Sequence, residues 1–114
     1  MAFDQWAVVV VPFPFTDQAA ERRRPAVVVS RPEHLGRAVG HSVLAMVTSA
    51  AHQRWPLDVP ITDLATAGVP APSVVRMKLF TLDDRLVHRQ VGALVAADAA
   101  AAAESLARLL TGRN

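Results

Sequence analysis

Apolar, β-branched runs alternate along the chain with short stretches that are polar or contain proline and glycine, a pattern typical of proteins built from short strands. The first run, residues 6–11, is continuously apolar and predicts a strand buried on both faces, ended by Pro12 and Pro14. Similar runs predict further strands over 25–30, 42–49, 57–61, 73–80 and 86–91. The short 57–61 run alternates and contains Pro60, as expected of an edge strand.

The segments between these runs predict turns and one helix. Residues 16–24 are polar and predict a hairpin loop, Asp83–Asp84 predicts a turn, and 63–72 predicts a loop or a single helical turn. From Asp98 onward alanines and a stripe of three leucines precede Gly112, which predicts a C-terminal amphipathic helix capped by Asp98. The whole pattern predicts a mainly-β, α+β fold: a small barrel or sandwich with a C-terminal helix.

Composition narrows the class of protein. With 114 residues, 52% of them hydrophobic, we expect one domain over residues 1–114 with a real core. The chain contains no cysteine, which excludes disulfides, thiolate zinc sites and a cysteine nucleophile and fits a reducing cytoplasm. The longest apolar stretch, Ala7 to Phe15, is too short and too broken by prolines for a signal peptide or a membrane span.

All basic residues except Lys78 are arginines, although the net charge is only +2. A GC-rich genome explains scattered arginines well, but explains the consecutive run 22–24 less well. Pro25 favours an extended backbone at Arg24, whose planar guanidinium suits the oxygens of a phosphodiester. On this motif alone, phosphate binding and a solvated charge run are equally good interpretations. The hydroxyls of Thr48 and Ser49, at the end of a neighbouring strand, would either reach the same phosphate or form a turn.

Several chemistries are missing from the sequence. The histidines His34, His41, His52 and His88 have no recognisable metal spacing, and there is no glycine-rich phosphate loop or nucleophile elbow. We therefore expect no metal and no cofactor, and surface or hydrogen-bonding roles for the histidines. Any catalysis must use arginine, hydroxyl groups and at most one carboxylate.

Four sequence blocks together resemble the PemK/MazF family of toxins from bacterial toxin–antitoxin pairs. The blocks are V-P-F-P-F-T-D at 11–17, R-P-A-V-V-V-S at 24–30, V-T-S at 47–49 and S-V-V-R-M-K-L-F-T-L-D at 73–83. They keep the order of the family and span nearly the whole chain.

The resemblance implies an SH3-like barrel with a C-terminal helix, a homodimer and a cognate antitoxin as partner. It also implies metal-independent, sequence-selective cleavage of single-stranded RNA, in which the ribose 2′-hydroxyl attacks to leave a cyclic phosphate and a 5′-hydroxyl. The catalytic positions of the family carry over to Arg24 and Thr48, and to Arg76 as a second phosphate clamp or leaving-group donor. An ion pair of Arg76 with Asp83 or Asp84 is the alternative for that residue.

Single-stranded RNA is generally recognised by loops that stack and hydrogen-bond splayed bases. The residues we expect to contact RNA are Phe15, Gln18, Arg22, Arg23, Ser49, His52, Gln53, Trp55 and Lys78. Arg22 and Arg23 would steer the RNA or bind an acidic antitoxin tail. Trp55 would equally serve to cover the end of the barrel or a dimer interface.

Three positions depart from the family pattern. Trp6-Ala7 replaces the usual glycine and acidic residue at the first strand, Lys78 replaces an aspartate that is catalytic in some members, and Gln18 replaces a histidine used by others. A proton-transfer scheme built on aspartate or histidine is therefore not carried over.

Three alternative functions remain open at this point. One is a toxin of the same fold that acts on a protein such as a topoisomerase, against which Arg24 together with Thr48 argues. The others are a binding module without turnover and an inactive or retargeted copy of the nuclease.

Overall fold

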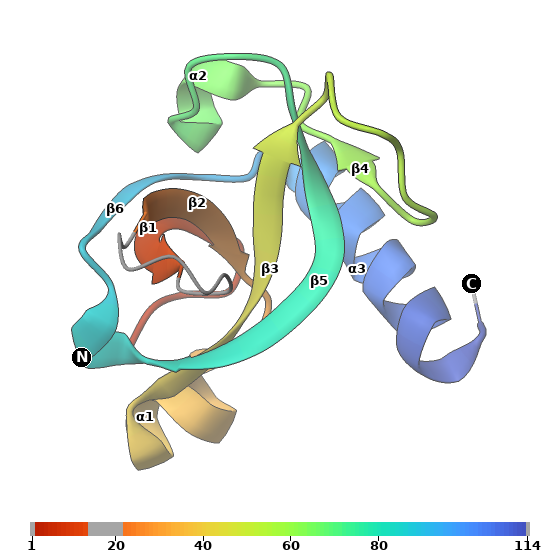
Figure 1. Ribbon diagram of the computed structural model, residues 1–114. Coiled ribbons are helices and arrows are strands. Elements are labelled where there is room, and N and C mark those ends of the chain that lie inside the picture. Colours follow the sequence, from red (N-terminus) through yellow and green to blue (C-terminus); the bar gives the residue numbers. More distant parts are fainter. Residues whose placement is uncertain (1, 14–21, 114) are drawn as a thin grey trace.

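The computed structural model describes residues 2–13 and 22–113, and in these residues the chain forms one curled antiparallel sheet with helices at its margins (Figure 1). The order of strands across the sheet is β4-β5-β3-β2-β1-β6. The strands are β1 (Ala7–Phe13), β2 (Arg22–Val28), β3 (His41–Ser49), β4 (Val59–Pro60), β5 (Ser73–Asp83) and β6 (Arg89–Ala93). This confirms the predicted mainly-β, α+β fold and the edge position of the strand that contains Pro60.

The sheet buries apolar side chains on both faces, because β1, β2 and β3 are continuously apolar in their centres. A first cluster includes Val8, Val27, Ala45 and Val75 and packs against the C-terminal helix. A second cluster lies on the opposite face and consists of Ala7, Val9, Val11, Ala26, Val28, Leu44 and Met46. Since neighbouring residues of a strand point to opposite faces, each central strand contributes to both clusters.

The predicted strand positions are correct, but several ends differ. The second strand begins at Arg22 rather than at Pro25, because Arg22, Arg23 and Arg24 pair with β1 and so continue the ladder into the predicted 16–24 loop. The strand at 73–80 extends to Asp83, and the last one runs over 89–93 instead of 86–91. A single 3₁₀ turn at Asp84–Leu86 separates these two strands, which confirms the turn predicted at Asp83–Asp84.

The C-terminal helix α3 covers Ala96–Thr111 and lies alongside β4 and β5. Asp98 does not cap it: the helix begins two residues earlier, and the Asp98 carboxylate instead accepts hydrogen bonds of 2.8 Å from the backbone N–H and the hydroxyl of Thr62. The predicted cap is therefore wrong, because a tertiary contact uses this side chain. Gly112 ends the helix with a φ of 71°, as glycine favours.

The other helical segments are short. A helical turn at Pro32–Gly36 leads into α1 (Arg37–Val39). Helix α2 (Leu64–Ala67) confirms the single helical turn predicted within 63–72, and Asp63 caps it by accepting from the Thr66 N–H. None of the helices in the described ranges is long and apolar enough to cross a membrane.

The first departure from the family pattern has a structural counterpart at Trp6. This residue has a φ of 73°, in the left-handed region that favours glycine, which is the residue the family usually has at this point. The strained backbone is held by two hydrogen bonds, from the Trp6 N–H to the Val28 carbonyl and from the Leu94 N–H to the Trp6 carbonyl. The indole also packs against the first cluster. The two hydrogen bonds and the packing of the large side chain thus offset the strain at Trp6.

Helix α2 and strand β6 approach each other closely at Gly92. A Cβ added there would lie 2.7 Å from the Ala67 carbonyl oxygen and would also overlap the Thr66 carbonyl. We expect Gly92→Ala to lower the free energy of unfolding by about 2 kcal/mol, because backbone must shift to accept the methyl group. Urea denaturation measures this, with Gly40→Ala for comparison: a Cβ there meets nothing within 4 Å, so its cost is limited to the strain of a φ of 68°, about 1 kcal/mol. Equal losses for the two variants would contradict the close approach.

Candidate RNA-cleavage site

The candidate catalytic residues come from three adjacent strands and share one face of the sheet. Ala26 of β2 pairs with Met46 of β3, and Arg24 and Thr48 each lie two residues further along these strands, toward the same end of the sheet. On the other side of β3, Met46 pairs with Arg76 of β5. Because directly paired residues lie on the same face, Arg24, Thr48 and Arg76 all belong to the face of the second cluster.

Arg24 is held by the strand at its base and has an available guanidinium. It pairs with Val11, which is fully buried, so the Cα of Arg24 is fixed by the central part of the sheet. Its side chain is half-buried and has no hydrogen-bond partner among the described residues. Arg22 shares this face, whereas Arg23 points to the other one, and both are exposed. A rigidly based guanidinium with open donors is suited to bind a phosphate.

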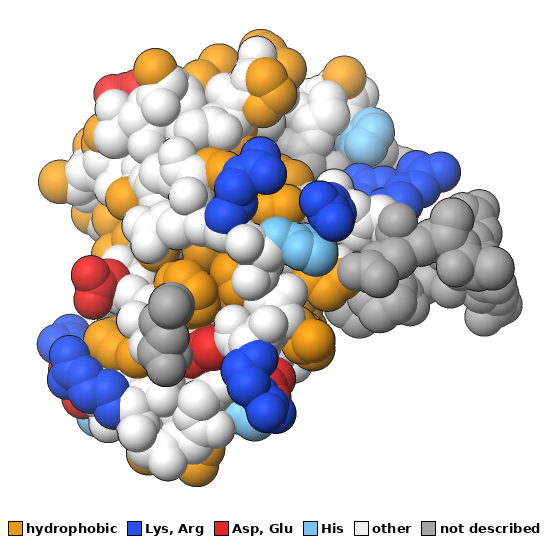
Figure 2. Space-filling model, turned by 90° about the vertical axis from the view of Figure 1, so that its left-hand side faces the viewer, with side chains coloured by type: hydrophobic (Ala, Val, Ile, Leu, Met, Phe, Trp, Pro, Cys, Tyr) orange, Lys and Arg blue, Asp and Glu red, His pale blue; other side chains and the backbone are white. Residues whose placement is uncertain are grey.

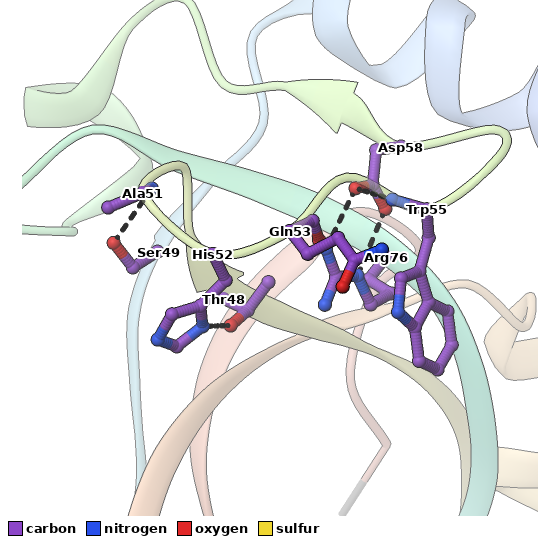
Figure 3. A network of polar contacts seen from close by, with 8 residues as sticks. All are labelled: Thr48, Ser49, Ala51, His52, Gln53, Trp55, Asp58 and Arg76. Atoms are coloured by element: carbon purple, nitrogen blue, oxygen red, sulfur yellow. Dashed lines mark hydrogen bonds and ion pairs between the residues drawn. The ribbon is translucent and has the colours of Figure 1, made fainter.

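Thr48 forms a direct contact with His52. After β3 ends, a tight turn closes through hydrogen bonds from the His52 N–H to the Ser49 carbonyl and from the Ala51 N–H to the Ser49 hydroxyl. The turn folds the chain back so that the Nδ1 atom of His52 lies 2.9 Å from the Thr48 hydroxyl oxygen (Figure 3). The ring of His52 is exposed, and its Nε2 atom lies on the edge away from Thr48 (Figure 3).

Arg76 holds the loop between β3 and β4. Its Nε and Nη2 atoms donate to the two carboxylate oxygens of Asp58 at 3.2 and 2.9 Å, and Nη2 also donates to the Gln53 carbonyl at 2.7 Å. The guanidinium carbon lies 4.6 Å from the ring centre of Trp55, a cation–π contact (Figure 3). The expected alternative partners Asp83 and Asp84 are therefore wrong: the acidic partner is Asp58.

The environment of the Arg76–Asp58 ion pair favours the charged form of both side chains. Only 10% of the Arg76 side chain and 4% of the Asp58 side chain are exposed. Burial acts to raise the pKa of Asp58, but hydrogen bonds from Arg76 and from the Trp55 N–H, with the positive charge of Arg76, outweigh it and lower the pKa. The hydrogen bond to Asp58 in turn raises the pKa of Arg76. Both groups stay ionised, and their attraction ties the loop to β5.

The same loop contains a strained turn. Leu57 has a φ of 69°, and the Asp58 N–H faces the Trp55 carbonyl at 3.4 Å, so residues 55–58 form a turn with Pro56 at its second position. A positive φ at the third position normally requires glycine or asparagine. The Asp58 carboxylate also accepts a hydrogen bond of 2.9 Å from the backbone N–H of Trp55, and this contact holds Leu57 in its conformation.

The remaining predicted RNA contacts fall into two groups. Gln53 and Trp55 lie on the loop tied to Arg76, are exposed, and 43% of the Trp55 surface is accessible. Ser49 points to the face opposite Thr48 and its hydroxyl stabilises the turn, and Lys78 lies in an irregularity of the β3–β5 ladder. Phe15 and Gln18 lie outside the described residues. The structure thus brings His52 into contact with Thr48, and Gln53 and Trp55 into contact with Arg76, whereas Ser49 points to the other face and the role of Lys78 stays a prediction.

A second surface adjoins the site through β1 and β6. Val11 pairs with Arg24, and the His88 N–H donates to the neighbouring Val10 carbonyl, so β6 begins close to the arginine strand. A cavity of about 740 Å³ opens there. It is lined by Phe3, Val39, Gly40, His41, Asp83, Asp84, Arg85, Val87, His88, Arg89 and Gln90. Figure 2 shows basic, histidine and acidic side chains among apolar ones on this side of the molecule.

Sequence reasoning missed two functional contacts. Asp58 was read as an ordinary residue of the edge strand, and its tie to Arg76 joins segments eighteen positions apart. The pairing of His52 with Thr48 was also missed, although a four-residue separation after a strand end that contains Ser49 is a usable signal for a turn. Within the described ranges, no three histidine, aspartate or glutamate side chains are grouped as a metal site would require.

Comparison with solved structures defines the class of protein. The toxin in a MazE–MazF crystal structure from Deinococcus radiodurans is 26% identical, with full coverage of both chains and a TM-score of 0.77. Two further folds are alike: the Mycobacterium tuberculosis toxin MazF-mt6 (21% identity, 95% and 98% coverage, TM-score 0.72), and a mycobacterial endoribonuclease in complex with its cognate antitoxin (17% identity, 99% and 96% coverage, TM-score 0.74). The class is therefore that of small MazF-type toxins.

The family assignment rests on sequence as well as on fold. The family model described as PemK-like, MazF-like toxin of type II toxin–antitoxin system matches residues 4–110. The chain belongs to this family, which confirms the resemblance found in the sequence blocks. No curated protein matches the sequence.

Proposed function

We propose that this protein is a metal-independent endoribonuclease that cleaves single-stranded RNA. The observation that carries the proposal is the alternation of side chains on β2 and β3, which puts Arg24 and Thr48 on the same sheet face as the paired residues Ala26 and Met46. The family assignment and the endoribonuclease named among its structural relatives support it. The site lies on a rigid sheet, as the positioning of a reacting phosphate requires.

The proposed reaction uses the substrate as its own nucleophile. The ribose 2′-hydroxyl attacks the adjacent phosphorus, and the P–O5′ bond breaks to leave a cyclic phosphate and a free 5′-hydroxyl. Arg24 donates to the equatorial oxygens, on which negative charge develops, and Thr48 donates one further hydrogen bond. Donors preorganised in this way are commonly worth about 3 kcal/mol each.

Recognition of the RNA falls to the loop between β3 and β4 in this proposal. Arg76 is a positioning residue, because two of its nitrogens are engaged with Asp58 and Gln53 and its face is stacked on Trp55. The exposed part of Trp55 offers a base-stacking surface. Flanking nucleotides would contact the exposed Arg85 and Arg89 beside the start of β6.

The proposed partners follow from the family. A second copy of the chain and a cognate antitoxin would bind the toxin, as an antitoxin does in the Deinococcus MazE–MazF structure and in the mycobacterial complex. Arg22 and Arg23, both exposed, would steer RNA or bind an acidic antitoxin segment. We place the protein in the cytoplasm, because its RNA substrate is there and the chain has no cysteine that would call for an oxidising compartment.

Incubation of the purified protein with a long unstructured RNA in EDTA tests the function. We expect discrete fragments whose new 5′ ends accept phosphate from a polynucleotide kinase without prior phosphatase treatment, and whose 3′ ends carry a cyclic phosphate. Intact RNA under conditions in which the protein is folded would contradict the proposal. Cleavage that requires an added divalent cation would contradict the metal-independent mechanism.

A further inference from the structure

The Thr48–His52 contact assigns a function to a histidine that the sequence reading placed among RNA-binding residues. The Nδ1 atom of His52 and the Thr48 hydroxyl oxygen are 2.9 Å apart, and the exposed ring projects its Nε2 atom away from the strand (Figure 3). Ser49 fixes this arrangement, since its carbonyl and hydroxyl accept the two hydrogen bonds that close the turn. The ring is thus oriented by the fold before any substrate binds.

The proposed reaction needs a proton at one atom that no arginine supplies well. As P–O5′ breaks, the leaving oxygen gains negative charge and must be protonated. Arginine stays charged to above about pH 12 and is a poor proton donor. For Arg76 the hydrogen bond to Asp58 raises the pKa further. Histidine is the side chain that exchanges protons near neutral pH, and His52 is the one in direct contact with Thr48 among the described residues.

We propose that His52 is the general acid of the cleavage reaction, an inference that rests on the proposed endoribonuclease function. In its charged form the Nδ1–H donates to the Thr48 oxygen, which turns the single hydroxyl proton of Thr48 toward the phosphate. The Nε2–H lies on the other edge of the ring, which is exposed, and so remains available to RNA bound over Thr48. From there it donates to O5′.

The step balances without a further reactant besides water. The O2′–P bond forms as the P–O5′ bond breaks, the proton of the 2′-hydroxyl passes to water, and the Nε2 proton of His52 passes to O5′. Solvent then returns a proton to the imidazole. General acids placed in this way contribute about 100-fold or more to the rate.

A substrate whose leaving group needs no acid separates this function from a structural one. Once the cleavage site is mapped, RNA is prepared with either the normal oxygen or a bridging sulfur at the scissile 5′ position, since a thiolate leaves without protonation. We expect His52→Ala to slow cleavage of the oxygen substrate about 100-fold and to cleave the sulfur substrate within a few-fold of the wild-type rate. Arg24→Ala, which removes charge stabilisation, should be slow on both.

His52→Asn serves as the matched control, because its amide nitrogen takes the place of Nδ1 and keeps the contact with Thr48 but carries no exchangeable acid proton. The inference requires this variant to be as slow as His52→Ala on the oxygen substrate. A near wild-type rate for His52→Asn, or equal slowing of His52→Ala on both substrates, would overturn it while leaving the nuclease function intact. Failure of the wild-type protein to cleave either RNA would overturn the proposed function itself.

Discussion

Replacement of Arg24 by alanine should reduce RNA cleavage by about 100- to 1,000-fold while leaving the fold unchanged. The guanidinium is the half-buried group with open donors on the site face, and it has no partner among the described residues whose loss would disturb the structure. Because the interaction strengthens as negative charge develops on the phosphate, the loss should appear mainly in kcat. Single-turnover cleavage of a fluorescent RNA with saturating protein measures it.

A charge-matched control makes this result specific. Arg37 is an exposed arginine of α1, away from the site strands, and Arg37→Ala removes the same charge. We expect its cleavage rate to equal that of the wild type, and the unfolding midpoints of the two variants to agree. An Arg24→Ala protein that cleaves at the wild-type rate would remove the basis of the proposed site, and equal losses for both variants would reduce it to a general charge effect.

Much of the fold was predictable because the sequence encodes it locally. The continuous valine runs of β1 and β2 favour a strand that is buried on both faces. Pro60, which lacks an N–H, favours an edge position for its strand. The ends were less predictable. The polar residues Arg22–Arg24 are typical of a loop, yet they extend β2, because their backbone pairs with residues 11–13 of β1. Pairing between strands is a property of the tertiary structure, and residue polarity does not report it.

The phosphate-binding residues of the site were predictable, but the ion pair that holds the neighbouring loop was not. Arg24 and Thr48 are found in sequence motifs at strand ends, and the pairing of β2 with β3 then puts them on the same face at the same end of the sheet. The partner of Arg76 was not predictable, because two aspartates follow it closely in sequence, whereas the true partner, Asp58, lies eighteen positions before it, at the end of a strained turn. Short separation in sequence favours Asp83 and Asp84 as partners. The pairing of β4 with β5 instead brings Asp58, just before β4, next to Arg76.

The two polar contacts of the loop between β3 and β4 give it separate anchors. At its start the ring of His52 contacts the Thr48 hydroxyl, and at its end Asp58 binds Arg76. The exposed Gln53 and Trp55 lie between these anchors. A loop fixed at both ends presents base-contacting groups at a defined distance from the phosphate site, and it loses little entropy when RNA binds. One short loop thus contains both the histidine that contacts the cleavage site and the side chains proposed to bind bases.

Replacement of Asp58 by asparagine should lower the free energy of unfolding by about 3 kcal/mol, because it leaves the nearly buried charge of Arg76 without an opposite charge. The strained Leu57 turn should relax as well, since Asp58 also binds the Trp55 N–H. Urea denaturation at pH 7 measures the loss. Glu33→Gln is the matched control: it breaks the exposed Arg31–Glu33 pair, and its unfolding midpoint should stay close to that of the wild type.

The pH dependence of this stability difference has a definite sign. Burial tends to raise the pKa of Asp58, but hydrogen bonds from Arg76 and from the Trp55 N–H, with the charge of Arg76, lower it below the ordinary value of 3.8. A carboxyl group with a lowered pKa in the folded state stabilises the protein fully above its unfolded pKa and loses this contribution as the pH falls through the folded value. The difference between the wild type and Asp58→Asn should therefore be constant near neutral pH and shrink below about pH 3.8. Parallel stability curves across the acid range would show that the ion pair with Arg76 does not stabilise the fold.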